Sequence, residues 1–295
     1  MSDTWIEGKI RLEKAVEKDA ADDILLEGYD KILVNIKEDG SIITEKLDDT
    51  GNIKNKKGGI EMLRDTLKDK EYFLEYIAEE EDRLNKFETK LRNNEVREDR
   101  ILNVRKKVYD LEFQILIAKY SMGEPIESLI DDYKLIAGKM EGFWDINLYE
   151  DMLWMLAIGI MLEIDKNIFD ILAKLVEKHK VNDFLYNFII HYRNEEVNYQ
   201  NSNWLFEKPF KSLINVIMCN DNTKSCEFMK EYLLEQWYVG HNDMGWYECH
   251  KHQDKLYFGY WSFESGAIMK ILGLDDSILK DVSYYPYDMV HFKNE

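Results

Sequence analysis

Residues 60–92 read IEMLRDTLKDKEYFLEYIAEEEDRLNKFETKLR, and this stretch decides the fold class. Its large apolar residues recur at gaps near three, four and seven, which is the spacing of one face of an α-helix. Charges of both signs fill the opposite face. A second stripe of this kind begins at Ile101, after the polar Asn93-Asn94 break. We therefore predict an antiparallel helical hairpin over residues 60–120.

Helical patterns continue beyond this hairpin. Residues 152–162 are apolar on all sides, which predicts a central, buried helix. Only 3 prolines and 15 glycines occur in 295 residues, too few for the many tight turns of a sandwich or barrel. We predict an all-α fold, a layered array of antiparallel helices, whose further helices cover 167–179, 182–193, 209–219, 222–237 and 262–272, with a short last turn at 276–280.

The first 59 residues have a different pattern. Residues 5–28 are expected to form short helices, whereas the β-rich runs 31–37 and 41–44 flank Asp39-Gly40 and predict a small β-hairpin. Residues 48–59 are polar and predict a flexible connection. We divide the chain into an N-terminal extension (1–59), a helical hairpin module (60–122) and a C-terminal helical module (123–295).

The cysteines and the apolar runs indicate the compartment. Three cysteines without a CxxC pair do not predict a disulfide framework: Cys219, Cys226 and Cys249. The first residues lack the pattern of a signal peptide, and the run 152–162 is too short to span a bilayer. We expect a cytoplasmic protein that does not enter a membrane.

The chain carries 58 acidic residues against 39 basic ones, a formal net charge of −19. Such a field repels DNA and anionic membranes and attracts a basic protein. Residues 124–170 hold 11 acids, 3 lysines and no arginine, so we expect a basic partner to bind there and no direct contact with nucleic acid. The alternative is that these acids are solvated helix faces. The candidate binding residues are Asp131, Asp132, Glu141, Asp145, Glu150, Asp151, Glu163 and Asp165.

Residues 240–288 are dense in Gly, His, Trp and Tyr, as an active site or metal site can be. A structural zinc site needs four ligands with short paired spacings, and only His250 and His252 make such a pair. Glycines permit tight turns, and buried Trp and Tyr rings can satisfy loop backbone groups. We therefore expect no catalytic residue, metal or cofactor, and a structural role for His241, Trp246, His250, Gly259, Tyr260, Trp261, Glu264 and Pro286. A metal-dependent hydrolase using His241, His250 and His252 stays the alternative.

The same segment resembles the PoNe immunity protein family in Gly240-His241, Gly245-Trp246-Tyr247, His250-Lys251, residues 257–264 (YFGYWSFE) and Tyr285-Pro286-Tyr287-Asp288. Residues 64–73 (RDTLKDKEYF) resemble the N-terminal module of that family. The resemblance covers residues 60–295 and departs from the family pattern at Ser265-Gly266-Ala267, where an alanine-rich stretch would be expected.

The resemblance implies an all-helical, non-catalytic protein that neutralises a PoNe-type DNase toxin. Together with the negative charge, it predicts that the chain binds the cognate toxin and covers its basic DNA-binding surface. A helical scaffold for another basic protein shares these electrostatics and remains a second alternative.

Overall fold

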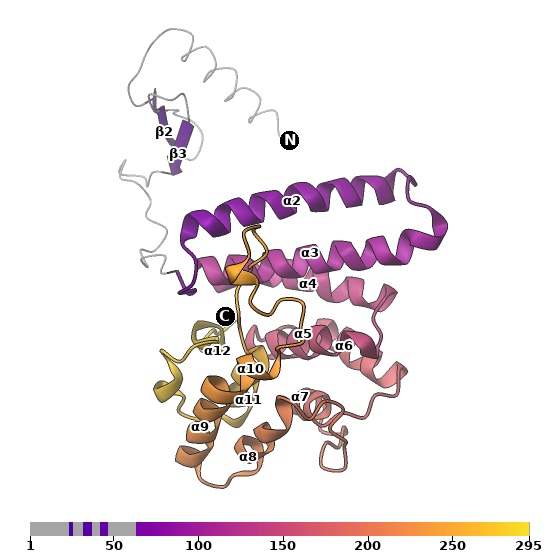
Figure 1. Ribbon diagram of the computed structural model, residues 1–295, viewed down its shortest axis with the longest axis vertical. Helices are drawn as coiled ribbons and strands as arrows, with labels where there is room; N and C mark the ends of the chain where they lie inside the picture. Colours follow the sequence, from indigo (N-terminus) through magenta and orange to yellow (C-terminus); the bar gives the residue numbers. More distant parts are fainter. Residues whose placement is uncertain (1–23, 26–31, 37–41, 47–62, 295) are drawn as a thin grey trace. The chain divides into compact units, whose positions relative to one another are not determined.

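The computed structural model describes residues 24–25, 32–36, 42–46 and 63–294 of the chain (Figure 1). The chain divides into two compact units, Met1–Glu61 and Met62–Glu295. The predicted boundary at residue 59 lies close to this division and stays a prediction. The further division near residue 122 stays a prediction.

The N-terminal unit contains a three-stranded antiparallel sheet in the order β1 (Ile24–Leu25), β2 (Ile32–Ile36) and β3 (Ile42–Lys46). Val34 pairs with Thr44 across β2 and β3, which confirms the predicted hairpin. The helix expected over residues 5–28 is wrong at its end, because Ile24 and Leu25 pair with β2 instead. Ile24 is β-branched, which suits strand pairing better than a short helix. The rest of that prediction, and the connection 48–59, lie outside the described residues.

The helical unit opens with the predicted hairpin, α2 (Lys70–Arg92) and α3 (Ile101–Met122), and the two helices pack along one another. The Asp69 side chain caps α2 by accepting a hydrogen bond from Tyr72 N. Gly123 ends α3 at φ +98°, a left-handed conformation that glycine adopts without strain.

Four helices form the middle of the unit: α4 (Leu129–Lys139), α5 (Tyr149–Met161), α6 (Lys166–Lys178) and α7 (Phe184–Arg193). Every residue of α5 from Met152 to Met161 is buried, which confirms the predicted central helix. Helix α5 packs against α6, α7 and α11, so the core is built around it (Figure 1).

The last third contains α8 (Leu213–Met218), α9 (Asn222–Glu231), a π-helical turn (Tyr232–Trp237), α10 (Tyr238–Gly240), α11 (Phe263–Leu272) and α12 (Tyr287–Val290). Short 3-10 turns occupy Glu98–Arg100, Ile126–Ser128, Met140–Gly142, Ile146–Leu148, Phe210–Ser212, Cys249–Lys251 and Ser277–Leu279. The helices of this unit pack on one another in layers, and the all-α prediction is confirmed. Within the described residues, no helix is both long and apolar enough to cross a membrane.

Gly266 explains how α11 approaches the central helix so closely. A Cβ atom at this position would lie 2.5 Å from Met161 Sδ and 2.7 Å from Pro286 Cγ. The departure from an alanine-rich stretch therefore costs helix propensity but allows close packing of α11.

Candidate functional site

The aromatic segment, residues 240–288, is tied to the end of α3. Trp261 Nε1 donates a hydrogen bond of 2.8 Å to Ser121 Oγ, and Ser121 Oγ lies 3.0 Å from the Phe258 carbonyl oxygen. Gly259 stands between them at φ +123°, and a Cβ there would lie 2.0 Å from Ser121 Oγ. Only glycine fits this crossing, which supports the structural role predicted for Gly259 and Trp261.

A second set of contacts joins the segment to the start of α2. The Tyr72 hydroxyl donates to the Tyr257 carbonyl and accepts from the Tyr257 amide, both at 3.0 Å. The Tyr257 hydroxyl donates to the buried Asp65 carboxylate. Arg64 Nε pairs with Asp288 at 2.7 Å. The two stretches that carry the family resemblance, 64–73 and 257–288, are therefore in direct contact, which no local pattern in the sequence indicates.

His241 lies inside the helical unit, 2% exposed, at the end of α10. Its Nδ1 donates to the Trp237 carbonyl at 2.6 Å, and its Nε2 lies 2.6 Å from Glu150 Oε1. Trp246 Nε1 also donates to Glu150, at 3.2 Å. The imidazole is thus fixed by α5 and by its own helix.

Glu264 is the second buried charge of this region. It is fully buried and accepts hydrogen bonds from Tyr232 OH at 3.0 Å and Ser262 Oγ at 2.7 Å. Desolvation raises the pKa of Glu264, and the charge of His241 opposes that rise. Burial lowers the pKa of His241, but hydrogen bonding to Glu150 and the charges of Glu150 and Glu264 outweigh burial and raise it. The three groups form one internal charge network.

The other two histidines of the hydrolase alternative, His250 and His252, have partners of their own. His250 Nδ1 lies 2.9 Å from the Tyr260 hydroxyl, and the exposed His252 lies 3.5 Å from Asp254. Burial raises the pKa of the Cys249 thiol, which disfavours a thiolate nucleophile. Within the described residues, no three His, Cys, Asp or Glu side chains converge as metal ligands. The described residues therefore do not form the metal site that the alternative prediction, a hydrolase, needs.

Three of the eight candidate binding acids have partners elsewhere in the helical unit, and a fourth, Asp151, is desolvated. Glu150 pairs with His241, Asp132 pairs with Lys119 at 2.7 Å, and Glu163 pairs with Lys270 at 3.2 Å. Desolvation, aided by the charge of Asp110, raises the pKa of Asp151 to about 7. These four residues support the fold.

The other four acids are exposed: Asp131, Glu141, Asp145 and Asp165. Asp131 pairs with Lys134 on the same helix at 3.6 Å but stays 95% exposed. Asp145 Oδ1 accepts from Asn147 N at 2.8 Å and caps the turn before α5. The four side chains come from α4, the connection between α4 and α5, and the residue before α6. They are scattered over a helix and the connections that follow it, and their contact with a toxin stays a prediction.

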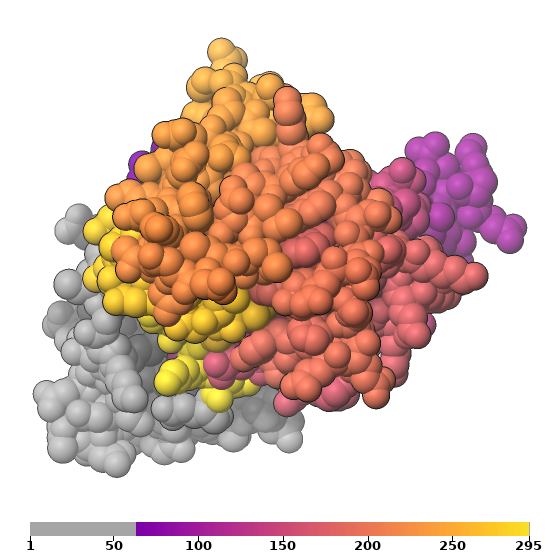
Figure 2. All heavy atoms as spheres, turned by 90° about the horizontal axis from the view of Figure 1, so that it is seen from below, coloured from indigo at the N-terminus to yellow at the C-terminus, as the bar shows by residue number. Residues whose placement is uncertain are grey.

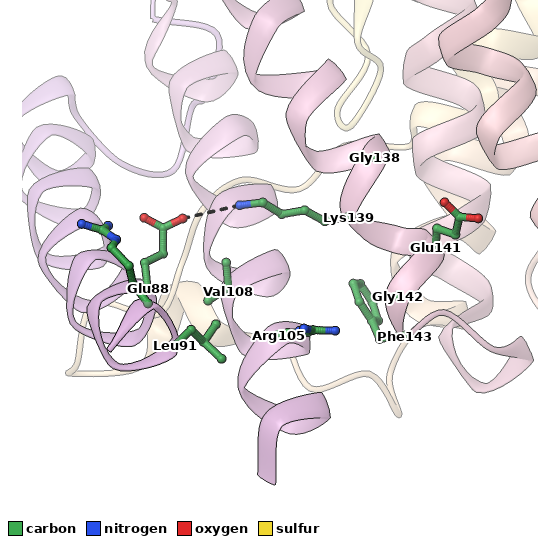
Figure 3. Close-up of a pocket in the computed structure, with 10 residues that line it drawn as sticks. Glu88, Leu91, Arg105, Val108, Gly138, Lys139, Glu141, Gly142 and Phe143 are labelled. Atoms are coloured by element: carbon green, nitrogen blue, oxygen red, sulfur yellow. Dashed lines mark ion pairs between the residues drawn. The ribbon is translucent and has the colours of Figure 1, made fainter. Parts of the chain in front are cut away.

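A hollow of about 550 Å³ lies between α2, α3 and the end of α4 (Figure 3). Its apolar wall is made by Leu91, Val108 and Phe143. Lys139 Nζ crosses it to Glu88, at 3.6 Å, and also pairs with Glu112. Glu88 also lines a second hollow of about 270 Å³ between the same helices. The first hollow, with its apolar wall, can accept apolar side chains. The sequence did not predict it because three separate helices build it.

The comparisons with known proteins agree with this architecture. The family model described as "PoNe immunity protein (PoNi), N-terminal" matches residues 64–174, and "PoNe immunity proteins (PoNi), C-terminal" matches residues 181–289. None of the curated proteins matches the chain. The crystal structure of protein PA2201 from Pseudomonas aeruginosa is similar, with a TM-score of 0.56 and 16% identity over 79% of this chain and 91% of that chain. This identity shows a shared fold alone.

The two family matches follow one another with a gap of only a few residues and include both stretches that meet at Tyr72 and Tyr257. On this evidence, the chain belongs to the PoNe immunity protein family.

Proposed function

We propose that this chain binds a cognate PoNe-type DNase toxin in the producing bacterium and neutralises it by covering its basic DNA-binding surface. The match to both parts of the immunity family over residues 64–289 carries this proposal. The net charge of −19 supports it, because an acidic protein is complementary to a surface that binds phosphates.

The proposed inhibition needs no chemistry from the immunity protein. A nuclease holds DNA with lysine and arginine side chains that neutralise phosphates. Exposed carboxylates, such as those of Asp131 and Glu141, can pair with the same cations and exclude the substrate. Association is then expected to be fast at low salt and to slow as salt screens the charges.

The internal use of the ionisable groups in residues 240–288 supports binding as the mode of action. His241 and Glu264 are enclosed in one buried network, and His250 contacts Tyr260. A hydrolase needs a free base and a nucleophile that face one substrate, whereas these groups are held by neighbouring side chains.

Co-expression with the nuclease encoded beside this gene tests the proposal. Cells that express the nuclease alone should lose DNA and die, whereas cells that also express this chain should survive. The purified pair should co-elute at low salt, and this chain should block DNA cleavage by the nuclease in vitro. Death of the co-expressing cells, together with no complex at low salt, would reject the proposal.

A further inference from the structure

The outer face of α9 and the turn after it carries three exposed glutamates, Glu227, Glu231 and Glu235. Within the part of the chain that the structure describes, none of them pairs with a lysine, arginine or histidine. This helix belongs to the orange segment that makes up much of the face shown in Figure 2. The three carboxylates are therefore free to bind cations of another molecule.

The π-helical turn Tyr232–Trp237 keeps these side chains in one line. In an α-helix, with about 3.6 residues per turn, each step of four residues moves a side chain slightly forward around the axis. A π turn is wider, so the same step moves the side chain slightly back. The step from Glu227 to Glu231 is α-helical and the next steps cross the π turn, so Glu235 and Val239 return to the line of the first two glutamates.

Apolar side chains accompany the glutamates. Leu234 is 56% exposed and Val239 is 53% exposed, and the Phe228 ring lies at the other edge of the face. Exposed carboxylates with apolar neighbours suit a protein surface in which lysine and arginine stems lie beside apolar groups. A lysine, Lys230, stands at the same edge as Leu234 and limits the acidic face there.

The face is held rigidly from below. Tyr232 OH donates to Glu264, the Trp237 ring is fully buried, and His241 closes the helix through the Trp237 carbonyl. Cys226 Sγ contacts the Asp275 carbonyl oxygen at 3.2 Å on the inner side of α9. A pre-ordered helix loses little conformational entropy when it binds, which favours a tight complex.

Several acids on the exposed face of α2 are already paired. On α2, Glu75 and Glu79 both bind Lys255, and Asp82 binds Lys86. An acid with an internal cation gains less from a new one, because it must first give up its partner. The face of α9 differs from these paired acids because it combines three unpaired glutamates with the exposed side chains of Leu234 and Val239.

We propose that this face, defined by Glu227, Glu231, Glu235, Leu234 and Val239, is the docking surface for a basic patch of the toxin. The inference rests on the proposed function and adds where the partner binds. The glutamates pair with lysine or arginine side chains of the toxin, and Leu234 and Val239 pack against their apolar surroundings.

The test uses the full chain and the toxin encoded beside its gene, inactivated at its catalytic site. The variant E227K/E231K/E235K should bind this toxin at least about tenfold more weakly than the unchanged chain, measured by calorimetry. The matched control E177K/E195K/E196K alters net charge equally at exposed glutamates that lie elsewhere and have no ion pair in the described structure. The control should retain most of the affinity.

Three outcomes decide the result. Equal weakening by both variants would show that only overall charge matters, and unchanged binding by the α9 variant would show that the face is not used, so either one overturns the inference. Absence of binding by the unchanged chain would instead reject the proposed function. Circular dichroism checks folding, and the near-isosteric E227Q/E231Q/E235Q replaces the lysine variant if that variant is unfolded. Its affinity should also fall, and unchanged binding would overturn the inference.

Discussion

Trp261 Nε1 donates a 2.8 Å hydrogen bond to Ser121 Oγ across 140 positions of sequence. This bond fixes the aromatic segment on the end of α3, and the chain passes between the two groups at Gly259. This joint between the aromatic segment and α3 therefore requires a residue without a side chain at position 259.

Gly259→Ala is expected to destabilise the protein by about 2–4 kcal/mol, since the added Cβ meets Ser121 Oγ and the residue must keep a positive φ. Urea unfolding measures this change. Gly245→Ala is the control in the same segment, because a Cβ there meets nothing within 4 Å. A Gly259→Ala protein as stable as the Gly245→Ala protein would contradict this account of the joint.

Gly266→Ala tests the close packing of α11. The new methyl group would meet Met161 Sδ and Pro286 Cγ, so we expect a loss of about 1–3 kcal/mol despite the better helix propensity of alanine. Gly138→Ala in α4 meets no atom within 4 Å and should be neutral or stabilising by up to about 1 kcal/mol. Thermal unfolding of both variants gives the comparison, and stabilisation by Gly266→Ala would refute the packing argument.

Local signals in the sequence were enough to predict the long helices, but the short α12 was not predicted. The apolar spacing of residues 60–92 and the all-apolar run 152–162 correspond to α2 and α5 because helical periodicity is a property of one segment. The contacts Asp65–Tyr257 and Glu150–His241 could not be predicted, since each joins side chains that are distant in sequence. For the same reason, counting acids in residues 124–170 could not separate surface carboxylates from buried ones.

The π turn was missed for a related reason. Residues 222–237 read as a simple helix, but Tyr232 must reach Glu264 while Trp237 stays buried in the core. Such a turn follows from tertiary anchoring, and nothing in its local composition separates it from an α-helix.

The network around His241 makes stability depend on pH. The pKa of His241 in the fold is raised above its usual value of about 6.5. The folded protein therefore holds the proton more tightly, and this stabilisation is full below the usual pKa and is lost as pH rises through the raised pKa. We expect the stability difference between the unchanged chain and His241→Gln to be largest near pH 6 and to shrink at alkaline pH. Chemical unfolding over a pH series measures it, and a difference that grows with pH would contradict the assignment.

Asp151 adds a contribution that can be separated from that of His241. Because its pKa is raised to about 7 by desolvation, the folded protein binds a proton that the unfolded chain releases at lower pH. Stability from this group falls as pH rises from about 4 to about 7. Asp151→Asn should flatten this part of the pH profile. Compared with the unchanged chain at the same pH, the stability of the variant should be more favourable at pH 8 than at pH 5. The exposed Asp131→Asn, at a side chain with 95% exposure, is the control and should leave the profile unchanged.

The exposed acids outside α9 are expected to act on the rate of association. Asp131 is exposed on α4, and Glu141 and Asp165 are exposed on the connections that follow, so they contribute to the field that attracts a basic toxin without forming one contact surface. Reversing all three to lysine should slow association at low salt and leave dissociation nearly unchanged, since long-range steering does not hold a formed complex. Reversal of Glu227, Glu231 and Glu235 should instead speed dissociation. Surface plasmon resonance at two salt concentrations separates the two rates, and faster dissociation of the Asp131, Glu141 and Asp165 variant would place the toxin contact on residues 124–170 instead.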